Sequence, residues 1–324
     1  MIKIDTLTHV YPGSRKLGPR TAIDSLSLHV RDGEFVILSG PNGSGKSTLF
    51  RILCGLALPS AGRVAVAGYD LFAQPAKVRQ VVGVVFQSPA VDKHLTVGEN
   101  LRIHADLYGI RDFAARRDEA LGWTDLGGRI DHKVDTLSGG LARQVELAKV
   151  LMTHPRVLLL DEPTTGLDPA SRRMFLAALG RLQKDRGMTV LMTSHVFAEA
   201  EEADRVAIMR DGKLLAYDTP AALRELIGTE MVVIQPTDAN GLAERLRAEM
   251  GLAVRVHGDE IRLEETENGD GLPLLERILQ RYRPEILSIS IKQPGLEDVF
   301  VHVTGKAVPE HAHPVRDLQR TGTL

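Results

Sequence analysis

A glycine-rich stretch that follows a short apolar run constrains this chain more than any other feature. Residues 35–38 are apolar and predict a buried strand, and residues 48–54 have the spacing of a helix. The stretch between them matches the pattern G-x-x-x-x-G-K-[ST]. Its residues are Gly40, Pro41, Asn42, Gly43, Ser44, Gly45, Lys46, Ser47 and Thr48. Glycines let successive N–H groups point at phosphate oxygens, and the helix start adds a positive dipole end. The stretch therefore predicts a nucleoside triphosphate site, with Lys46 on the β- and γ-phosphates and Ser47 on magnesium.

Composition limits the classes of protein that this chain can belong to. Its 324 residues are 43% hydrophobic, as expected for one large domain with a small one. A formal charge of -2 argues against nucleic-acid binding driven by bulk charge. Cys54 is the single cysteine, which excludes an internal disulfide. The charged N-terminus does not resemble a signal peptide, and no apolar run approaches the roughly 20 residues that span a bilayer. We expect a soluble chain, or one held to a membrane by another protein.

Polar residues follow two further apolar segments. Residues 81–86 predict a buried strand that ends at Gln87, and residues 189–194 predict one that ends at His195. In α/β folds, ligands bind at the carboxyl ends of the strands. Gln87 can accept a hydrogen bond from a magnesium-bound water, and His195 can reach the same pocket. For both, a plain polar strand end is an alternative that these residues alone leave open.

Two adjacent acids, Asp161 and Glu162, follow the aliphatic run 157–160. Successive side chains of a strand point to opposite faces, so we expect these two carboxylates to have different roles. One would face the magnesium shell, and the other would face an attacking water.

Three further features are ambiguous when taken singly. Ser138, Gly139 and Gly140 precede a helical pattern, so they form either a second anion site or a plain helix start. Asp168 precedes Pro169 and predicts a helix cap, and an intermolecular contact is also possible. Tyr11 can stack on an adenine ring or be a half-exposed packing residue.

Two regions flank or interrupt this pattern of strands. Residues 92–135 are richer in polar residues and predict a helical insertion, opened by Thr96 with Glu99 three residues later. Residues 231–291 follow the order β-α-β-β-α-β, which predicts a ferredoxin-like unit. A short helix follows at 296–300, and residues 306–324 predict a disordered tail.

Together, and in this order, the motifs resemble the ATP-binding subunits of ABC transporters over residues 1–225. Ser138-Gly139-Gly140 between a phosphate loop and an Asp-Glu pair is the specific feature. Residues 294–300 are similar to the branch of drug-resistance and nodulation-factor exporters. The resemblance implies an α/β P-loop NTPase of ABC type with a mixed central sheet, an antiparallel β subdomain and a helical insertion at about 90–150. It also implies a C-terminal α+β domain at 226–305.

The resemblance also implies roles for single residues, with ATP and Mg²⁺ as cofactors. Tyr11 would stack on adenine, and residues 43–48 would wrap the phosphates. Ser47 and Gln87 would bind Mg²⁺, and Asp161 would hold it through water. Glu162 would be the general base, and His195 would contact the γ-phosphate. Ser138, Gly140 and Asp168 would face the nucleotide of a second subunit. The chain departs from the family at Leu141, where glutamine is frequent, which puts one polar contact in doubt.

The implied activity is ATP hydrolysis coupled to transport, most simply export, although import stays open. The implied partners are a second copy in a head-to-tail dimer and separate membrane-spanning permease subunits. The chain would lie on the cytoplasmic face of the cell membrane, with no nucleic-acid partner. A soluble ABC-type ATPase that acts on nucleic acid or ribosomes is the alternative. Such proteins usually carry two cassettes, long coiled coils or zinc cysteines, and this chain has one cassette and one cysteine.

Overall fold

The computed structural model describes residues 1–13, 18–228, 230–264 and 271–304. It divides into two compact units, each described by itself. Unit 1 comprises Met1–Thr229 and Pro294–Phe300, and unit 2 comprises Glu230–Gln293 and the residues from Val301 on. The predicted domain limits of 1–225 and 226–305 stay a prediction, since compactness alone does not show which segment folds by itself. The tail predicted at 306–324 lies outside the described residues.

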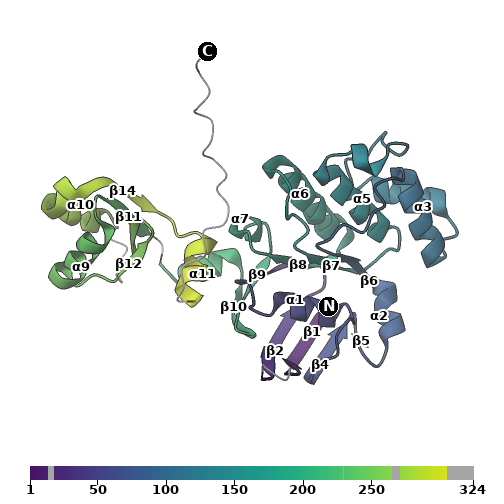
Figure 1. The fold of residues 1–324 in the computed structure, drawn as a ribbon, viewed down its shortest axis with the longest axis horizontal. Helices are drawn as coiled ribbons and strands as arrows, with labels where there is room; N and C mark the ends of the chain where they lie inside the picture. Colours follow the sequence, from purple (N-terminus) through teal and green to yellow (C-terminus); the bar gives the residue numbers. More distant parts are fainter. Residues whose placement is uncertain (14–17, 229, 265–270, 305–324) are drawn as a thin grey trace, which may run out of the picture. The chain divides into compact units, whose positions relative to one another are not determined.

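A six-stranded mixed sheet forms the centre of unit 1 (Figure 1). Five neighbouring strands run parallel, and an edge hairpin adds the sixth strand in the antiparallel direction. Continuous apolar sequence is typical of parallel strands covered on both faces, and two of these strands are buried along their whole length. In order across the sheet the strands are β10 (Lys213–Asp218), β9 (Arg205–Arg210), β3 (Phe35–Ser39), β8 (Thr189–Ser194), β7 (Val157–Asp161) and β6 (Val82–Val85).

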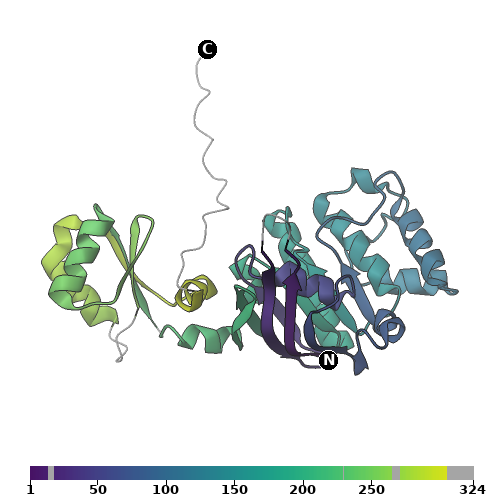
Figure 2. The same ribbon diagram turned by 60° about the horizontal axis from the view of Figure 1, so that its bottom comes forward.

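A second, antiparallel sheet packs below helix α1 (Lys46–Leu53), which lies between the two sheets (Figure 1). Figure 2 brings its long hairpin of β1 and β2 forward. Burial alternates along β1, so its apolar side chains lie on one face of the strand. Ile4 of β1 and Leu49 of α1 belong to the same core. The strand order is β2 (Arg20–Val30), β1 (Ile2–Tyr11), β4 (Ala61–Val66) and β5 (Tyr69–Asp70). The predicted mixed sheet and antiparallel subdomain are therefore confirmed.

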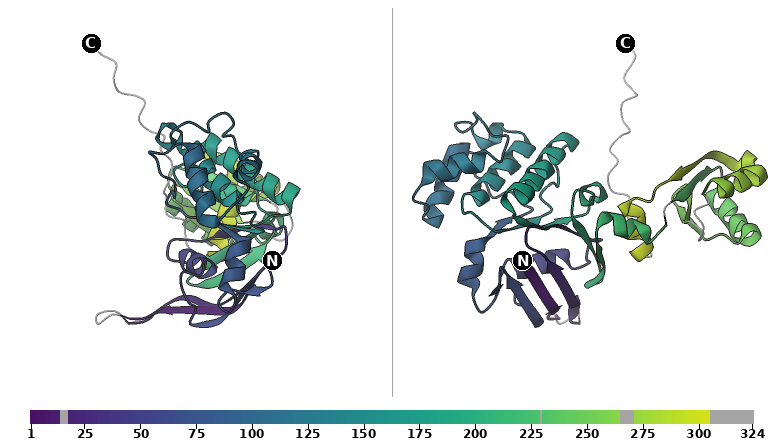
Figure 3. Two further views of the ribbon diagram at one scale, coloured as in Figure 1. Left: turned by 90° about the vertical axis from the view of Figure 1, so that its right-hand side faces the viewer. Right: turned by 180° about the vertical axis from the view of Figure 1, so that it is seen from behind.

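Helices cover the other face of the six-stranded sheet, as the view from behind also shows (Figure 3). The predicted cap is confirmed, since Thr96 and Glu99 form a reciprocal capping box at the start of α3. The long helices are α3 (Val97–Tyr108), α4 (Phe113–Leu121), α5 (Gly139–Leu151) and α6 (Pro169–Arg186). Unit 1 also contains the shorter helices α2 (Pro75–Val81), α7 (Phe197–Ala200) and α8 (Pro220–Glu225) and a 3-10 turn at Val134–Thr136, and Val78 of α2 belongs to the core around α1. No helix in the described ranges is long and apolar enough to cross a membrane.

One strand prediction was wrong at both ends. Val81 is the last residue of α2, which begins with Pro75 at its first position, and the strand β6 covers only Val82–Val85. Phe86 lies beyond the strand and is 40% exposed, with its ring edge-on to Phe50. A β-branched run that continues a helix looks the same in sequence as one that starts a strand.

Unit 2 is a four-stranded antiparallel sheet with two helices on one face (Figure 3). Ile234, Leu246 and Ile278 belong to the core between sheet and helices. The strand order is β12 (Val254–His257), β13 (Glu260–Glu264), β11 (Met231–Pro236) and β14 (Ile286–Lys292), and the helices are α9 (Ala239–Met250) and α10 (Gly271–Tyr282). A 3-10 turn at Arg283–Glu285 precedes β14, and the chain continues into α11 (Leu296–Thr304), whose residues 296–300 belong to unit 1. The predicted ferredoxin-like arrangement is confirmed by this order and by the antiparallel pairing.

Two glycines of unit 1 provide a matched test of its packing. A Cβ added at Gly83 in β6 would lie 2.2 Å from Val150 Cγ1, so Gly83→Ala should lower the free energy of unfolding by about 1–3 kcal/mol. A Cβ at Gly180 in α6 meets no atom within 4 Å, so Gly180→Ala should raise stability by up to about 1 kcal/mol. Thermal unfolding of the two variants measures both effects. Equal melting temperatures for the two variants would contradict the packing described for β6.

Candidate functional site

The glycine-rich loop joins β3 to α1, as the sequence predicts, and its glycines are required by space. A Cβ at Gly40 would lie 2.3 Å from the carbonyl oxygen of Met209, and one at Gly45 would lie 2.5 Å from that of Ala22. Gly45 also has a φ of 107°, which side-chain-bearing residues rarely adopt. The loop backbone is therefore pressed against β2 and β9, where a side chain at either glycine would not fit.

The loop has the properties that an anionic ligand needs. Gly45 caps α1 without a side-chain hydrogen bond, so the first N–H groups of the helix lack such a partner. Ser44 Oγ is buried and has no hydrogen-bond partner among the described residues. Lys46 Nζ donates to the carbonyl oxygens of Gly40 (2.6 Å) and Pro41 (3.1 Å). Burial lowers the pKa of Lys46, and the negative charges of Glu162 and Asp161 oppose that shift. Phosphate oxygens would satisfy each of these groups.

Tyr11 lies beside the loop. Its hydroxyl is 3.2 Å from Thr48 Oγ1, and its ring packs edge-on against His9 with 4.6 Å between the ring centroids. The residue is 36% exposed, so part of the ring is open to solvent. Ser47, at the start of α1, is also exposed. Both residues are available to a ligand held by the loop.

The two acids at the end of β7 do not alternate as the sequence predicts. Glu162 lies just beyond the strand with a φ of 41°, and this left-handed turn ends the strand alternation. Both carboxylates lie close enough to Lys46 to oppose the effect of burial on the pKa of this lysine. Thr193 joins the two acids, because its Oγ1 accepts from Glu162 N (2.8 Å) and donates to Asp161 Oδ1 (2.7 Å). Burial raises the pKa of Asp161, and the hydrogen bond from Thr193 opposes that shift.

Gln87, Thr165 and His195 converge on one oxygen of Glu162. Gln87 Nε2 donates to Glu162 Oε2 at 3.0 Å, and Thr165 Oγ1 donates to the same oxygen at 3.3 Å. His195 Nδ1 lies 3.4 Å from it. The three strands β6, β7 and β8 are parallel neighbours, so the residues that follow them meet at one edge of the sheet. The structure thus brings Gln87, Asp161, Glu162 and His195 together near Lys46.

The oxygen donors at this edge are few. No group of three or more histidine, cysteine or acidic residues suited to a metal occurs in the part of the chain that the structure describes. Ser47, Gln87 and Asp161 offer a hydroxyl, an amide and a carboxylate. Mg²⁺ prefers oxygen ligands and usually takes only one or two carboxylates, with waters and phosphate oxygens for the rest. This donor set fits Mg²⁺ that arrives with a nucleotide.

Ser138, Gly139, Gly140 and Asp168 form a separate surface where α5 and α6 begin. Ser138 Oγ accepts from Leu141 N at 3.3 Å, and a Cβ at Gly140 would lie 2.4 Å from Ser171 Oγ. Asp168 Oδ1 accepts from the backbone N–H groups of Ala170 and Ser171, which confirms the predicted cap of α6. Hydrogen bonds from Ser171 lower the pKa of Asp168. A role toward a second subunit stays a prediction for all four residues.

Sequence reasoning missed two buried residues behind the site, Thr193 and Glu199. Glu199 is 1% exposed and accepts from Thr164 Oγ1 (2.6 Å) and Ser194 Oγ (2.5 Å), with Arg172 Nε at 3.4 Å. It thereby ties the turn after Glu162 to the residue before His195. An acid four residues after His195 was the available signal, but an exposed helix face gives the same pattern.

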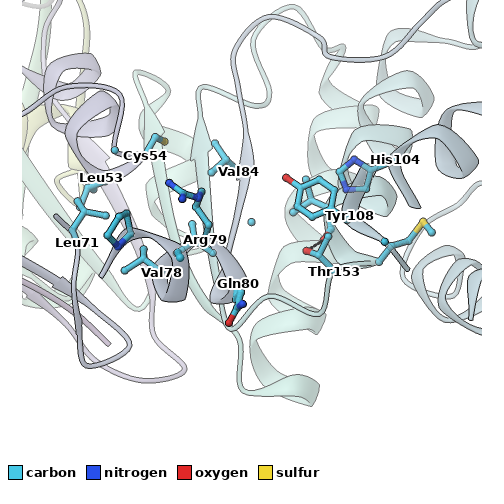
Figure 4. Close-up of a pocket in the computed structure, with 18 of the residues that line it drawn as sticks. Leu53, Cys54, Leu71, Val78, Arg79, Gln80, Val84, His104, Tyr108 and Thr153 are labelled. Atoms are coloured by element: carbon cyan, nitrogen blue, oxygen red, sulfur yellow. Dashed lines mark hydrogen bonds between the residues drawn. The ribbon is translucent and has the colours of Figure 1, made fainter. Parts of the chain in front are cut away.

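A groove of about 1270 Å³ opens elsewhere in unit 1, between α2 and α3 (Figure 4). Leu71, Val78 and Arg79 line one side, and His104 and Tyr108 line the other. Leu58 and Tyr108 are 72% and 62% exposed, so its rim presents apolar surface to solvent. Burial lowers the pKa of His104 to about 4, which leaves the ring neutral at neutral pH.

Comparisons with known proteins show the family of this chain. The family described as ABC transporter matches residues 23–165. The chain is 35% identical to the daunorubicin resistance ATP-binding protein DrrA3 of Streptomyces coeruleorubidus, over 93% of this chain and 96% of that protein. It is 34% identical to the Nod factor export ATP-binding protein I of Rhizobium etli, over 90% and 92%. A solved dimer of the ATP-binding cassette MJ0796, in a post-hydrolysis state with ADP and Pi, matches with a TM-score of 0.60 and 28% identity, over 68% of this chain and 98% of that one. The chain therefore belongs to the ABC transporter family, among the subunits that bind and hydrolyse ATP.

Proposed function

We propose that this ATPase powers export through a separate membrane-spanning partner, and that the residues around Glu162 carry out the hydrolysis. The observation that carries the proposal is the convergence of Gln87 and His195 on Glu162 Oε2, beside Lys46. Export is supported by relatives named for daunorubicin resistance and Nod factor export. A soluble ATPase that acts on nucleic acid receives no such support.

Binding of ATP falls to the loop and to Tyr11. The N–H groups of residues 43–48 and the orphaned Ser44 Oγ hold phosphate oxygens, and Lys46 turns from the loop carbonyls to the β- and γ-phosphates. The open part of the Tyr11 ring stacks on adenine. Ser47 and Gln87 would hold Mg²⁺, with Asp161 holding it through water. The ion would supply positive charge that offsets the negative charge of the triphosphate.

Glu162 acts as the general base. The attacking water gives one proton to the Glu162 carboxylate while the oxygen of the water bonds to the γ-phosphorus. The bond between the γ-phosphorus and the oxygen that bridges it to the β-phosphate breaks, which releases ADP. Thr193 and the turn at Glu162 aim the carboxylate. His195 donates to the γ-phosphate, and its place 3.4 Å from Glu162 Oε2 keeps it at the reacting group.

The second half of each site comes from another subunit. Ser138, Gly139 and Asp168 are exposed at the starts of α5 and α6, beside the buried Gly140, and this surface can bind the γ-phosphate of ATP in a partner. Two chains would then enclose two ATP molecules head to tail. The solved dimer of a similar cassette supports a dimer for this chain. Hydrolysis would release the interface and convert chemistry into an opening motion.

The groove between α2 and α3 receives the membrane-spanning partner. Its apolar rim and its volume suit a short helix from that partner, since a helix with side chains is about 10–12 Å across. The chain itself would then lie on the cytoplasmic face of the cell membrane.

Glu162→Gln tests the proposed base. The variant should bind ATP like the wild type but lose about 10²–10⁴-fold in turnover, because an amide cannot accept the proton. Phosphate release and equilibrium binding of a fluorescent ATP analogue measure the two effects. Glu201→Gln, which removes an exposed carboxylate paired with Arg224, is the matched control. Near-normal turnover in Glu162→Gln would exclude the proposed role.

Mixed dimers test the shared site. Ser138→Arg and Lys46→Ala chains should each be inactive, because each homodimer lacks an essential half of both sites. A mixed dimer keeps one site with intact Lys46 and Ser138, so random mixing should restore about one quarter of wild-type turnover. No recovery in a heterodimer verified by two affinity tags would argue against the head-to-tail dimer.

Two equally exposed leucines test the groove. Leu58 on its rim is 72% exposed, and Leu287 in unit 2 is 70% exposed. Leu58→Glu should weaken recovery of a membrane-spanning protein from detergent-solubilised membranes by about 10-fold or more, since it charges a side chain that the complex would bury. Leu287→Glu should recover it as the wild type does. Quantitative mass spectrometry of the captured proteins measures both, and an equal loss in the two variants would contradict the assignment.

A further inference from the structure

A buried ion pair occupies the middle of α5. The side chains of Arg143 and Glu146 are each 5% exposed, and Arg143 Nη1 donates to Glu146 Oε2. Burial of two charges carries a desolvation penalty that often exceeds their mutual attraction, so apolar residues of similar volume are frequently as stable. The pair is therefore poorly explained as a source of stability, and its remaining contacts indicate another role.

Each member of the pair reaches a different segment of the active site. Arg143 Nε donates to the carbonyl oxygen of Pro163 at 2.7 Å, and Pro163 directly follows Glu162. Glu146 Oε1 accepts from the N–H of Ala90, three residues after Gln87. One turn further along α5, Lys149 Nζ donates to the carbonyl oxygen of Ala90. The segments that follow Gln87 and Glu162 are therefore both tethered to one helix.

The turn at Glu162 needs such a tether. A left-handed conformation of a residue other than glycine is unfavourable and persists only when its surroundings determine it. The bond from Arg143 holds the peptide between Pro163 and Thr164, and the bond between Glu162 N and Thr193 holds the peptide before Glu162. Without Arg143, the downstream side of this turn would keep the bonds from Thr165 N to Glu162 O and from Thr164 to Glu199, but it would lose its link to α5.

We propose that Arg143 and Glu146 are positioning residues that set Gln87 against Glu162 and transmit movements of α5 to the Glu162 turn. The pair lies one to two turns from Ser138, so a shift at the start of α5 moves Arg143 with it. This inference rests on the proposed role of Glu162.

Replacement of the pair by apolar side chains separates positioning from stability. The double variant Arg143→Met with Glu146→Leu should keep a melting temperature close to that of the wild type. Its turnover should fall by about 10–100-fold, because small misplacements of a catalytic group are costly. Neither residue contacts the phosphate loop, so the Kd for a fluorescent ATP analogue should change by less than about 3-fold. Glu146→Gln keeps the shape of the side chain but removes its charge, and this second variant should also have a lower turnover than the wild type.

Two comparisons make the outcome decisive. Glu119→Gln removes a partner of Arg186 and His154 that has no link to the site, and it should leave turnover and nucleotide binding unchanged. In a Glu162→Gln background, the double replacement should lower the residual turnover by less than about 3-fold, since it acts through Glu162. A fully multiplicative loss in that background, or wild-type turnover in the folded variants, would overturn the proposal. Near-normal turnover of Glu162→Gln alone would instead overturn the proposed function.

Discussion

The carboxylate of Glu162 is the point on which the site depends. Its Oε2 accepts from Gln87 and Thr165 and faces His195, so it joins the ends of three neighbouring strands. Parallel strand order brings these ends to one edge, but it does not aim a side chain. The aim comes from the left-handed turn at Glu162, which places this carboxylate near the charge of Lys46 together with that of Asp161.

Lys46 and Asp161 lie at this edge in surroundings that disfavour their charged forms. Burial lowers the pKa of Lys46 and raises that of Asp161, so the fold disfavours the charged form of each. Their mutual attraction offsets part of this cost, and the loop carbonyls hold the Lys46 ammonium. A bound triphosphate would bring further negative charge to Lys46, so nucleotide binding should stabilise the charged form of this side chain.

Local patterns made much of this predictable. The phosphate loop, the cap at Asp168 and the β-α-β-β-α-β unit depend on residues close in sequence, and each is present as predicted. Predictions failed where a distant contact decides the geometry. Strand alternation could not anticipate the turn at Glu162, which Thr193 and Arg143 hold from other elements. The contacts of Glu146 were equally invisible, because a buried glutamate and a solvent-facing one give the same helical spacing.

Helix α5 connects the surface proposed for a second nucleotide, the segments around Glu162 and Gln87, and the groove proposed for the membrane partner. It begins beside Ser138, on the surface proposed to meet a second nucleotide, and the residues at its other end, Val150 and Met152, line the groove proposed for the membrane partner. Between the two, Arg143 and Glu146 bond the segments that carry Glu162 and Gln87. A helix of 13 residues spans about 20 Å, so α5 is long enough to connect the two ends. Displacement of α5 by a partner at either end would therefore shift the carboxylate proposed as the base, and this would link transport to hydrolysis without any change inside the phosphate loop.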